Sequence, residues 1–524
     1  MTSHFNRLLA YFLLLFTLLL PVSSQAQFLP FETLDPQPKH ETRAVWLTTY
    51  SGLDWPRQRA YDAASTELQK ADLCRILDYY QQININTVIF QTRVRGAVLY
   101  PSKYEPWYGA LTGTPGKAPL YDPLQFCIEE CHRRGMELHA WVVCIPLGKH
   151  AEQKQYGRGG ILSRRPDICK TFGKDVFMLP GNPKTADYIA SICREIAENY
   201  DVDGISLDYI RYPEKEFKFS DNNLYHGSAS GLADWKRENI TRIVRRIHDE
   251  VKAIKPWVKL SSSPIGKYDN TSRYSAGGWN CYSAVFQDPR QWLRDDLQDM
   301  LFPMMYFQGN HFYPFLYDWQ ENQYGHPVIP GLGIYFLDPR EGRWILSQVR
   351  AEMHSARRSE IGGIAFYRSE FLTRNVKGIY DCCRDEFFRH PALTARMTWM
   401  PQFAVLPSVP TDLHHTPGHL SWQGDAYCYN VYGSDEYPVD CRLAENLVAV
   451  RVLTNSYELK GRAGGLRYYA VTACNRYGNE TEPLQLVVQP AAESRLKQLN
   501  VSWLINRDLK GDKKSKKSKK KRKK

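Results

Sequence analysis

Between Arg43 and about Glu370, short β-prone runs alternate with amphipathic stretches, and this alternation constrains the fold more than any other feature. The β-prone runs are rich in Val, Ile, Leu and aromatic residues, whereas the stretches between them repeat apolar residues at helical spacing. Strands that alternate with helices form a parallel sheet, because the helix carries the chain back to the start of the next strand. Eight such units predict an α/β fold, a (β/α)8 TIM barrel. The β-prone runs are residues 44–49, 87–93, 137–143, 204–210, 259–264, 300–307, 328–335 and 363–368, and the helical stretches include residues 65–81, 122–134, 185–200 and 232–254.

A doubly wound parallel sheet is the alternative to a barrel. No glycine-rich phosphate loop follows the first β-prone run, which counts against a nucleotide-binding sheet of that kind. Residues 145–180, after the third run, are rich in Gly, Arg and Lys and are expected to form a long loop. In a barrel such a loop would form a wall of the cleft.

The pattern changes after Pro401, where short β-prone runs recur with turn residues between them. Residues 468–483 resemble the penultimate strand and last turn of a fibronectin type III sandwich, and Trp422 fits its first half. We therefore expect a TIM barrel over residues 41–395, a small all-β fibronectin type III-like domain over 402–490, and a linker with a disordered tail over 491–524. The short strands are expected at residues 419–422, 427–432, 448–453, 468–474 and 484–488.

The amino-terminal residues have the features of a cleavable signal peptide over residues 1–26. Arg7 is followed by an apolar run over residues 8–20 and by Ser24-Gln25-Ala26, a site suited to signal peptidase. The run is too short to span a membrane, no second apolar stretch follows, and no cysteine stands at the cleavage site. The sequence predicts an exported protein, periplasmic or secreted, with no transmembrane segment in the mature chain.

The net charge of +12 is concentrated in one segment. Residues 513–524 contain ten Lys or Arg, so the rest of the chain is nearly neutral. A nucleic-acid enzyme would carry its basic patch on the folded body, so no specific nucleic-acid partner is expected. The Lys-rich tail either contacts anionic envelope polymers electrostatically or is a solvated end without a partner.

The twelve cysteines indicate buried thiols more than a metal site. They are scattered without a CxxC pair, and several lie within apolar helical or strand patterns. Cys127 and Cys131 share a helix face, but no second pair completes a zinc site. No cofactor and no metal are expected.

Asp208 is the strongest candidate for a catalytic residue. It ends the apolar run of residues 204–207 and is followed by Arg211 and Tyr212. Catalytic groups of parallel barrels stand at the carboxyl ends of strands, although Asp208 could instead cap the next helix. Glycoside hydrolysis uses a second carboxylate, for which Glu370, at the end of the eighth run, is the first choice. The rivals are Glu214, Glu216, Asp221 and Asp338.

Eight motifs occur in the order seen in the bacterial glycosyl hydrolase-like 10 family, which the chain resembles over residues 41–370. They are Arg43-Ala-Val-Trp46, Asp54-Trp-Pro56, Gln91-Thr-Arg93, Leu111-Thr-Gly113, Tyr121-Asp-Pro-Leu124, His139-Ala-Trp141, Asp203-Gly-Ile-Ser-Leu-Asp208 and Phe302-Pro-Met-Met-Tyr306. The resemblance implies a secreted TIM-barrel protein whose glycan cleft is lined by Arg43, Trp46, Gln91, Arg93, His139, Trp141, Asp208 and Tyr306. The strand ends add Arg211, Tyr212, Gln308 and Tyr335 as substrate-binding candidates.

Two departures from the family pattern lie near the expected cleft. Gly96-Ala-Val98 stands where relatives commonly carry Gly-Asp-Ala, and Val142-Val-Cys-Ile-Pro146 replaces the usual Asn-Pro. The sequence thus predicts an exported glycosidase that cleaves a bacterial cell-wall (peptidoglycan-type) or related glycan by acid/base chemistry with two carboxylates. The alternatives are a glycan-binding barrel without catalysis and an envelope scaffold protein.

Overall fold

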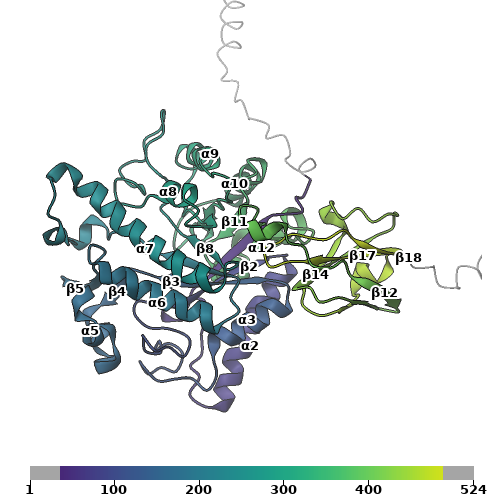
Figure 1. Cartoon of the computed structure of the whole chain (residues 1–524), viewed down its shortest axis with the longest axis horizontal. Coiled ribbons are helices and arrows are strands. Elements are labelled where there is room, and N and C mark those ends of the chain that lie inside the picture. Colours follow the sequence, from purple (N-terminus) through teal and green to yellow (C-terminus); the bar gives the residue numbers. More distant parts are fainter. Residues whose placement is uncertain (1–35, 488–524) are drawn as a thin grey trace, which may run out of the picture. The chain divides into compact units, whose positions relative to one another are not determined.

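The computed structural model describes residues 36–487 (Figure 1). Its main element is a parallel sheet of eight strands that curls on itself. In spatial order the strands are β10 (Gly331–Leu332), β11 (Gly363–Phe366), β1 (Thr42–Leu47), β2 (Thr87–Arg93), β3 (Glu137–Val143), β7 (Gly204–Asp208), β8 (Lys259–Ser262) and β9 (Met300–Leu301). Each strand lies within or overlaps one of the eight predicted runs, so the α/β class and the parallel sheet are confirmed.

The two edge strands of this sheet meet. Parallel bridges pair Leu301 with Val328 and Met304 with Gly331, and the Ile329 amide donates to the Leu301 carbonyl at 2.8 Å. These contacts join the β9 side to the β10 side. The arrangement is consistent with a TIM barrel.

Side chains of each strand alternate between two apolar layers, as the pleat requires. On β1, Val45 and Leu47 belong to the large core shared with the helices, whereas Ala44 and Trp46 belong to a smaller core inside the curl. Both faces of the sheet are therefore covered, which explains why the strands read as continuous apolar runs.

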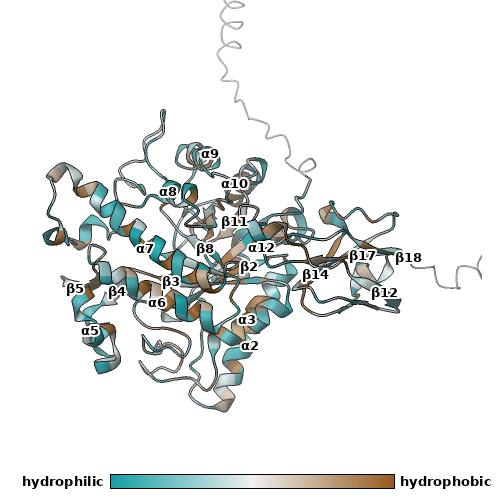
Figure 2. Ribbon diagram, viewed as in Figure 1, coloured by the Kyte–Doolittle hydropathy of each residue, from teal (hydrophilic) through white to brown (hydrophobic). Residues whose placement is uncertain are grey.

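The main helices around the sheet are α2 (Ala63–Gln82), α3 (Pro123–Arg133), α6 (Pro183–Asn199), α7 (Leu232–Ile254) and α10 (Leu346–Arg358). Local chemistry sets where several begin: Asp62 caps α2, Asp122 precedes Pro123 in α3, and Asn182 precedes Pro183 in α6. Figure 2 shows hydrophilic and hydrophobic residues interspersed along these helices. On α7 the buried residues include Ile240, Ile243, Val244, Ile247 and Val251, the spacing of one helical face.

The segment after β3 is not the long loop that the sequence predicted. It forms a small antiparallel sheet from β4 (Pro146–Lys149), β6 (Asp175–Met178) and β5 (Cys169–Phe172), with the short helices α4 (His150–Lys154) and α5 (Ile161–Arg164). The prediction was wrong because the many glycines and charged residues of this segment obscure the short apolar stretch of β6 in the sequence pattern. In the structure, Val176 and Phe177 of that stretch are buried.

Residues 411–487, here called the C-terminal β region, form two antiparallel sheets. The first contains β12 (Thr411–Thr416), β13 (His419–Gln423) and β16 (Ser456–Glu458), and the second contains β15 (Leu447–Val452), β14 (Cys428–Ser434), β17 (Tyr468–Cys474) and β18 (Leu484–Val487). Leu420, Trp422, Tyr429 and Val471 pack in the core of this region. Its assignment to the fibronectin type III fold stays a prediction.

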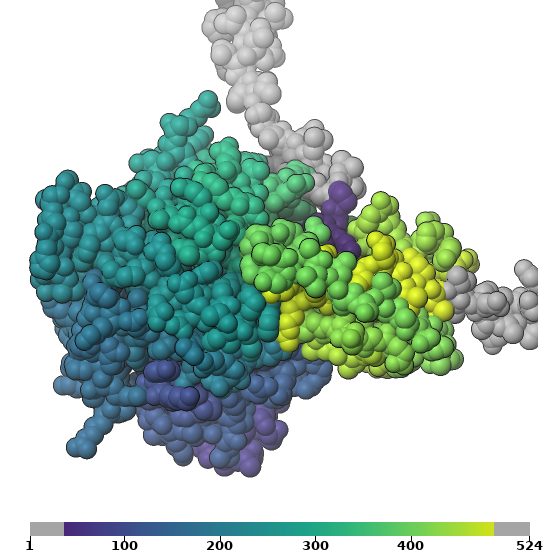
Figure 3. All heavy atoms as spheres, in the orientation of Figure 1, coloured from purple at the N-terminus to yellow at the C-terminus, as the bar shows by residue number. Residues whose placement is uncertain are grey.

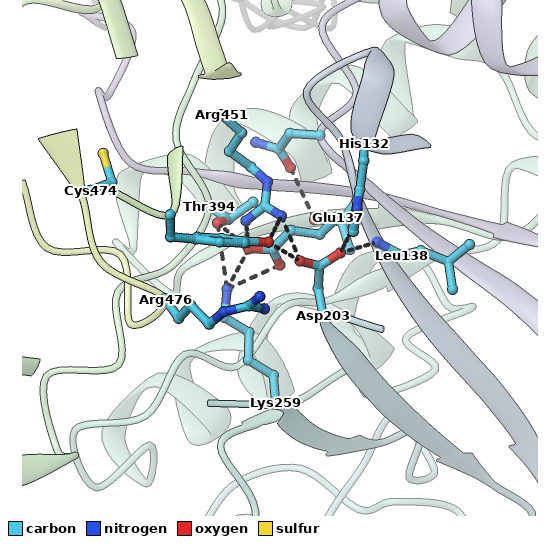
Figure 4. Close-up of polar contacts among 12 residues, drawn as sticks. His132, Glu137, Leu138, Asp203, Lys259, Thr394, Arg451, Cys474 and Arg476 are labelled. Atoms are coloured by element: carbon cyan, nitrogen blue, oxygen red, sulfur yellow. Dashed lines mark hydrogen bonds and ion pairs between the residues drawn. The ribbon is translucent and has the colours of Figure 1, made fainter. Parts of the chain in front are cut away.

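The C-terminal β region lies against the rest of the described chain (Figure 3), and its contacts there include the amino-terminal ends of two parallel strands. Arg451 contacts two carboxylates there: Glu137, the first residue of β3, at 3.3 Å, and Asp203, which precedes β7 (Figure 4). Lys259 lies 2.7 Å from Glu137, and His132 lies 2.8 Å from Asp203. This end of the sheet is opposite the end at which Asp208, the last residue of β7, stands.

The twelve cysteines are free thiols, and nine of them are buried. None of the helices within residues 36–487 combines the length and apolar character that a membrane span needs. The predicted signal peptide, the predicted linker and tail of residues 491–524, and the last three residues of the predicted fibronectin type III-like domain lie outside the described residues.

Candidate functional site

A cavity of about 220 Å³ opens at the carboxyl ends of the parallel strands. Residues at or just after the ends of β1, β2, β3, β7 and β11 line it, together with β6 of the small sheet. The small sheet therefore acts as the cleft wall that was expected of residues 145–180. The polar and indole side chains at the cavity include Gln91, Trp141, Asp175, Asp208, Arg211 and Glu214.

Asp208 is held in place by two hydrogen bonds. Trp141 Nε1 donates to Oδ2 at 3.0 Å, and the Tyr209 amide donates to Oδ1 at 2.7 Å. The side chain is buried, with 6% of the residue exposed. Burial raises the pKa of Asp208 to about 6, although the Arg211 guanidinium acts in the opposite direction. A carboxyl group with such a pKa can both hold and release a proton near neutral pH.

Arg211 is ion-paired to a second carboxylate at the same cavity, Glu214. Its Nη2 donates to Glu214 Oε1 at 2.7 Å, and its guanidinium lies 4.6 Å from the centre of the Tyr209 ring. Its Nε and Nη1 are buried and have no hydrogen-bond partner among the described residues. These two N–H groups are available to an oxygen of a bound ligand.

Gln91 connects the ends of β1 and β2 at the cavity. Its Oε1 accepts hydrogen bonds from Thr48 Oγ1, the Thr49 amide and the Tyr50 amide, each at 2.8 Å. With the carbonyl oxygen occupied in this way, the amide orientation is defined and its nitrogen can face a ligand.

Two of the predicted tyrosines, Tyr306 and Tyr335, contact a residue of the cavity lining but do not line the cavity themselves. Tyr306 stacks on Tyr367 with ring centres 5.4 Å apart, and Tyr335 meets Tyr367 edge-on at 5.8 Å. Tyr367 itself lines the cavity. Tyr212 also lines it, but its hydroxyl is held by Asp221 at 3.2 Å, so it contributes its ring.

The structure brings Gln91, Trp141, Asp208, Arg211 and Tyr212 together at the cavity. Four other predicted residues are buried in structural contacts elsewhere among the described residues. Arg43 is ion-paired to Glu41, Arg93 is ion-paired to Glu105, His139 contacts Glu137, and Trp46 packs inside the sheet.

Glu370 does not line the cavity that contains Asp208. It stands in the first turn of α11 (Ser369–Thr373) and pairs with Arg368 at 3.1 Å and with Arg374 at 3.3 Å. Gln308 is bonded to Gln348 at 2.8 Å, and it too lies outside the cavity lining. The carboxylates at the cavity are Asp175, Asp208 and Glu214.

The other candidates for the second carboxylate, Glu216, Asp221 and Asp338, do not line the cavity. Asp221 is buried and accepts from the Gly181 amide, and Asp338 is paired with Arg340. Among the described residues, no group of three or more His, Cys, Asp or Glu side chains is arranged to hold a metal ion.

The sequence did not single out several residues that the structure brings to the cavity: Tyr50, Arg95, Asp175, Tyr209 and Tyr367. Tyr367 directly follows β11, so the rule used for the other strand ends could have found it. Asp175 carried no such signal, because it lies in the segment that was read as a loop. Asp54 was quoted only as part of a motif, yet it accepts hydrogen bonds from Arg368 at 2.6 Å and the Thr48 amide at 2.9 Å.

Comparison with known proteins gives consistent matches. The family model described as Glycosyl hydrolase-like 10 matches residues 41–336. Glycosyl hydrolase YngK of Bacillus subtilis is 29% identical over 391 residues, which cover 70% of this chain and 75% of that protein. Glycosyl hydrolase DigH of Escherichia coli is 32% identical over 292 residues, which cover 52% of this chain and 66% of that protein.

Among solved structures, the glycoside hydrolase domain of PgaB (BpsB) from Bordetella bronchiseptica aligns with a TM-score of 0.46 at 12% identity, covering 66% of this chain and 98% of that one. The matched family and the named relatives support a glycosidase, which is the class of enzyme that the sequence predicted. The chain belongs to the glycosyl hydrolase-like 10 family.

Proposed function

We propose that this protein is an exported glycosidase that hydrolyses a bacterial cell-wall glycan of the peptidoglycan type, or a related amino-sugar polymer. The observation that carries the proposal is Asp208, a buried carboxyl at a strand's carboxyl end whose pKa is raised to about 6. The cavity around it combines an indole, an arginine with two free N–H groups and a second carboxylate. An indole can stack on a sugar ring, and arginine and carboxylate groups can bind its hydroxyls, so this combination suits a glycan.

Asp208 acts as the general acid in this proposal. Its proton passes to the glycosidic oxygen as the bond from that oxygen to the anomeric carbon breaks. The second carboxylate stabilises the positive charge that develops on the sugar, either by attacking the anomeric carbon or by taking a proton from the attacking water. Glu214 is the better candidate for this role because it lines the same cavity, and Glu370 is the alternative.

The domain organisation proposed with this function is a complete (β/α)8 barrel over residues 41–395 and a fibronectin type III-like domain over 402–490. The bridges between the β9 and β10 sides support the first, and the three-strand and four-strand sheets support the second. Export rests on the predicted signal peptide of residues 1–26. Residues 491–524 would be a linker with a Lys-rich tail.

A glycan-binding protein without catalysis is the second candidate. It is favoured by the ion pair between Glu214 and Arg211, because a carboxylate engaged in this way is a weaker base or nucleophile. In that case the cavity would bind sugar without cleaving it.

The test is product analysis by mass spectrometry. The wild type and Asp208→Asn would be incubated with intact peptidoglycan, peptide-free glycan strands and a panel of other polysaccharides, with the exposed Asp385→Asn as a matched control. New reducing ends from the wild type and the control, but not from Asp208→Asn, are expected. Cleavage of no substrate, with glycan binding retained by all three proteins, would favour the second candidate. Full activity of Asp208→Asn would remove Asp208 from the mechanism.

A further inference from the structure

A second cavity, of about 510 Å³, adjoins the cavity of Asp208. The two share Tyr50 and Arg95, so a chain of sugars bound at Asp208 can continue into the second cavity. Three arginines line the second cavity: Arg57, Arg59 and Arg95. Its one carboxylate is Glu152, which accepts a hydrogen bond from the Lys149 amide.

Arg95 is held at the boundary between the two cavities. Its guanidinium lies 4.2 Å from the centre of the Tyr50 ring, and its Nη1 donates to Tyr50 Oη at 3.0 Å. The Arg95 carbonyl accepts from Gln153 Nε2 at 2.7 Å, which fixes the backbone at this residue. A planar guanidinium that is positioned in this way retains further N–H donors for a ligand.

Arg59 lies against a glycine of the neighbouring loop. A Cβ added at Gly113 would stand 2.7 Å from Arg59 Cδ, so the side chain occupies space that only glycine leaves open. Gly113 also has a φ of +82°, which L side chains rarely adopt. The same glycine thus permits both the loop conformation and the position of Arg59 beside the cavity.

The three arginines make no ion pair with a carboxylate among residues 36–487, whereas Arg211, at the first cavity, is paired with Glu214. Three unpaired guanidinium groups around a concave surface create a positive potential that favours a bound anion. Guanidinium groups bind carboxylates with two parallel hydrogen bonds, which gives both affinity and orientation.

We propose that the second cavity is a subsite for a carboxylate-bearing sugar of the glycan, next to the position where the glycan is cleaved. This inference rests on the proposed function for the identity of the first cavity. The carboxylate has two possible sources. It can belong to an ether-linked acid substituent on an amino sugar, as in peptide-free peptidoglycan strands, or to the ring of a uronic acid.

The experiment measures binding apart from cleavage. Isothermal titration of the purified Asp208→Asn chain would compare oligosaccharides of peptide-free peptidoglycan with the same oligosaccharides after their carboxyl groups are reduced to alcohols. Uronic-acid oligosaccharides and neutral chitin oligosaccharides provide the other arms. Hydrogen bonds to charged groups contribute about 1.5–3 kcal/mol, which corresponds to an affinity difference of roughly 10-fold or more in favour of the carboxylated ligand.

Variants then assign this preference to the arginines. Arg57→Gln combined with Arg59→Gln in the Asp208→Asn background should remove most of the preference and weaken its dependence on salt. Arg442→Gln, a change at an exposed arginine of the C-terminal β region, should leave it intact. Both arginines of the double variant are exposed, and circular dichroism would verify its fold.

Equal affinity for the carboxylated and reduced ligands would overturn the subsite, as would equal losses for both ligands in the double variant. Preference for uronic acids over the peptidoglycan oligosaccharides would assign the carboxylate to the ring. Reducing-end release by the wild type tests the proposed hydrolase separately. Cleavage without carboxylate preference removes only the subsite, whereas preference without cleavage keeps the subsite and removes the hydrolase.

Discussion

Arg451 of β15 contacts two buried carboxylates of the parallel sheet, so replacing it by Met tests the contact between the C-terminal β region and the sheet. Its Nη1 lies 3.3 Å from Glu137, and its Nη2 donates to Asp203. After Arg451→Met, Glu137 keeps Lys259 at 2.7 Å and Asp203 keeps His132 at 2.8 Å. Removing one partner of a buried ion pair costs about 3–5 kcal/mol, and the remaining partners put the expected loss near the lower limit, about 3 kcal/mol.

The loss should also depend on pH, with a defined sign. Burial acts to raise the pKa of Glu137 and of Asp203, but Lys259 and Arg451 respectively hold these pKa values below the usual 4.5 and 3.8. A carboxyl whose pKa is lowered in the folded state stabilises the fold above its unfolded pKa and loses that contribution as the pH falls. The difference between wild type and variant should therefore be complete above about pH 5 and shrink below about pH 4.

The free energy of unfolding would be measured by urea titration with far-UV circular dichroism at pH 7 and pH 3.5. Arg442→Met is the matched control, because Arg442 lies in the same β region and its ion pair with Asp440 is exposed. Similar losses for the two variants at pH 7 would refute the reasoning. A loss for Arg451→Met that is equal at both pH values would show that the charges of Glu137 and Asp203 are not its cause.

The cavity and the sheet offer three further tests. Trp141→Phe removes a hydrogen-bond donor that lowers the pKa of Asp208. The apparent pKa of Asp208 in the pH profile of kcat/KM should therefore rise by about one to two units. An unchanged apparent pKa would contradict the assignment. Glu214→Gln should reduce kcat at least about 100-fold and Glu370→Gln less than about 3-fold, whereas the reverse order would transfer the second role to Glu370. Gly204→Ala places a Cβ 2.7 Å from the His139 imidazole of β3 and should destabilise the fold by about 1–3 kcal/mol. This loss would be measured as a lower Tm, and an unchanged Tm would show that the sheet relaxes freely.

Most of the fold could be predicted because local patterns specify it. The eight runs of apolar and β-branched residues, separated by helices with capping residues such as Asp62, are readable without knowledge of tertiary contacts. The small sheet after β3 could not be predicted in this way. Its strands are only four residues long, and β4 pairs with β6 across an intervening segment of about 25 residues rich in Gly, Arg and Lys.

The sequence by itself determined the class of the fold, the position of Asp208 at a strand's carboxyl end and the resemblance to a glycosidase family. These depend on residue type and on order along the chain. Only the tertiary structure decided that Glu214 shares the cavity with Asp208 whereas Glu370 lies outside it, and that Arg93 and His139 serve buried structural contacts. The physical reason is that long-range packing decides which side chains meet and which are buried. Burial in turn sets the pKa of Asp208.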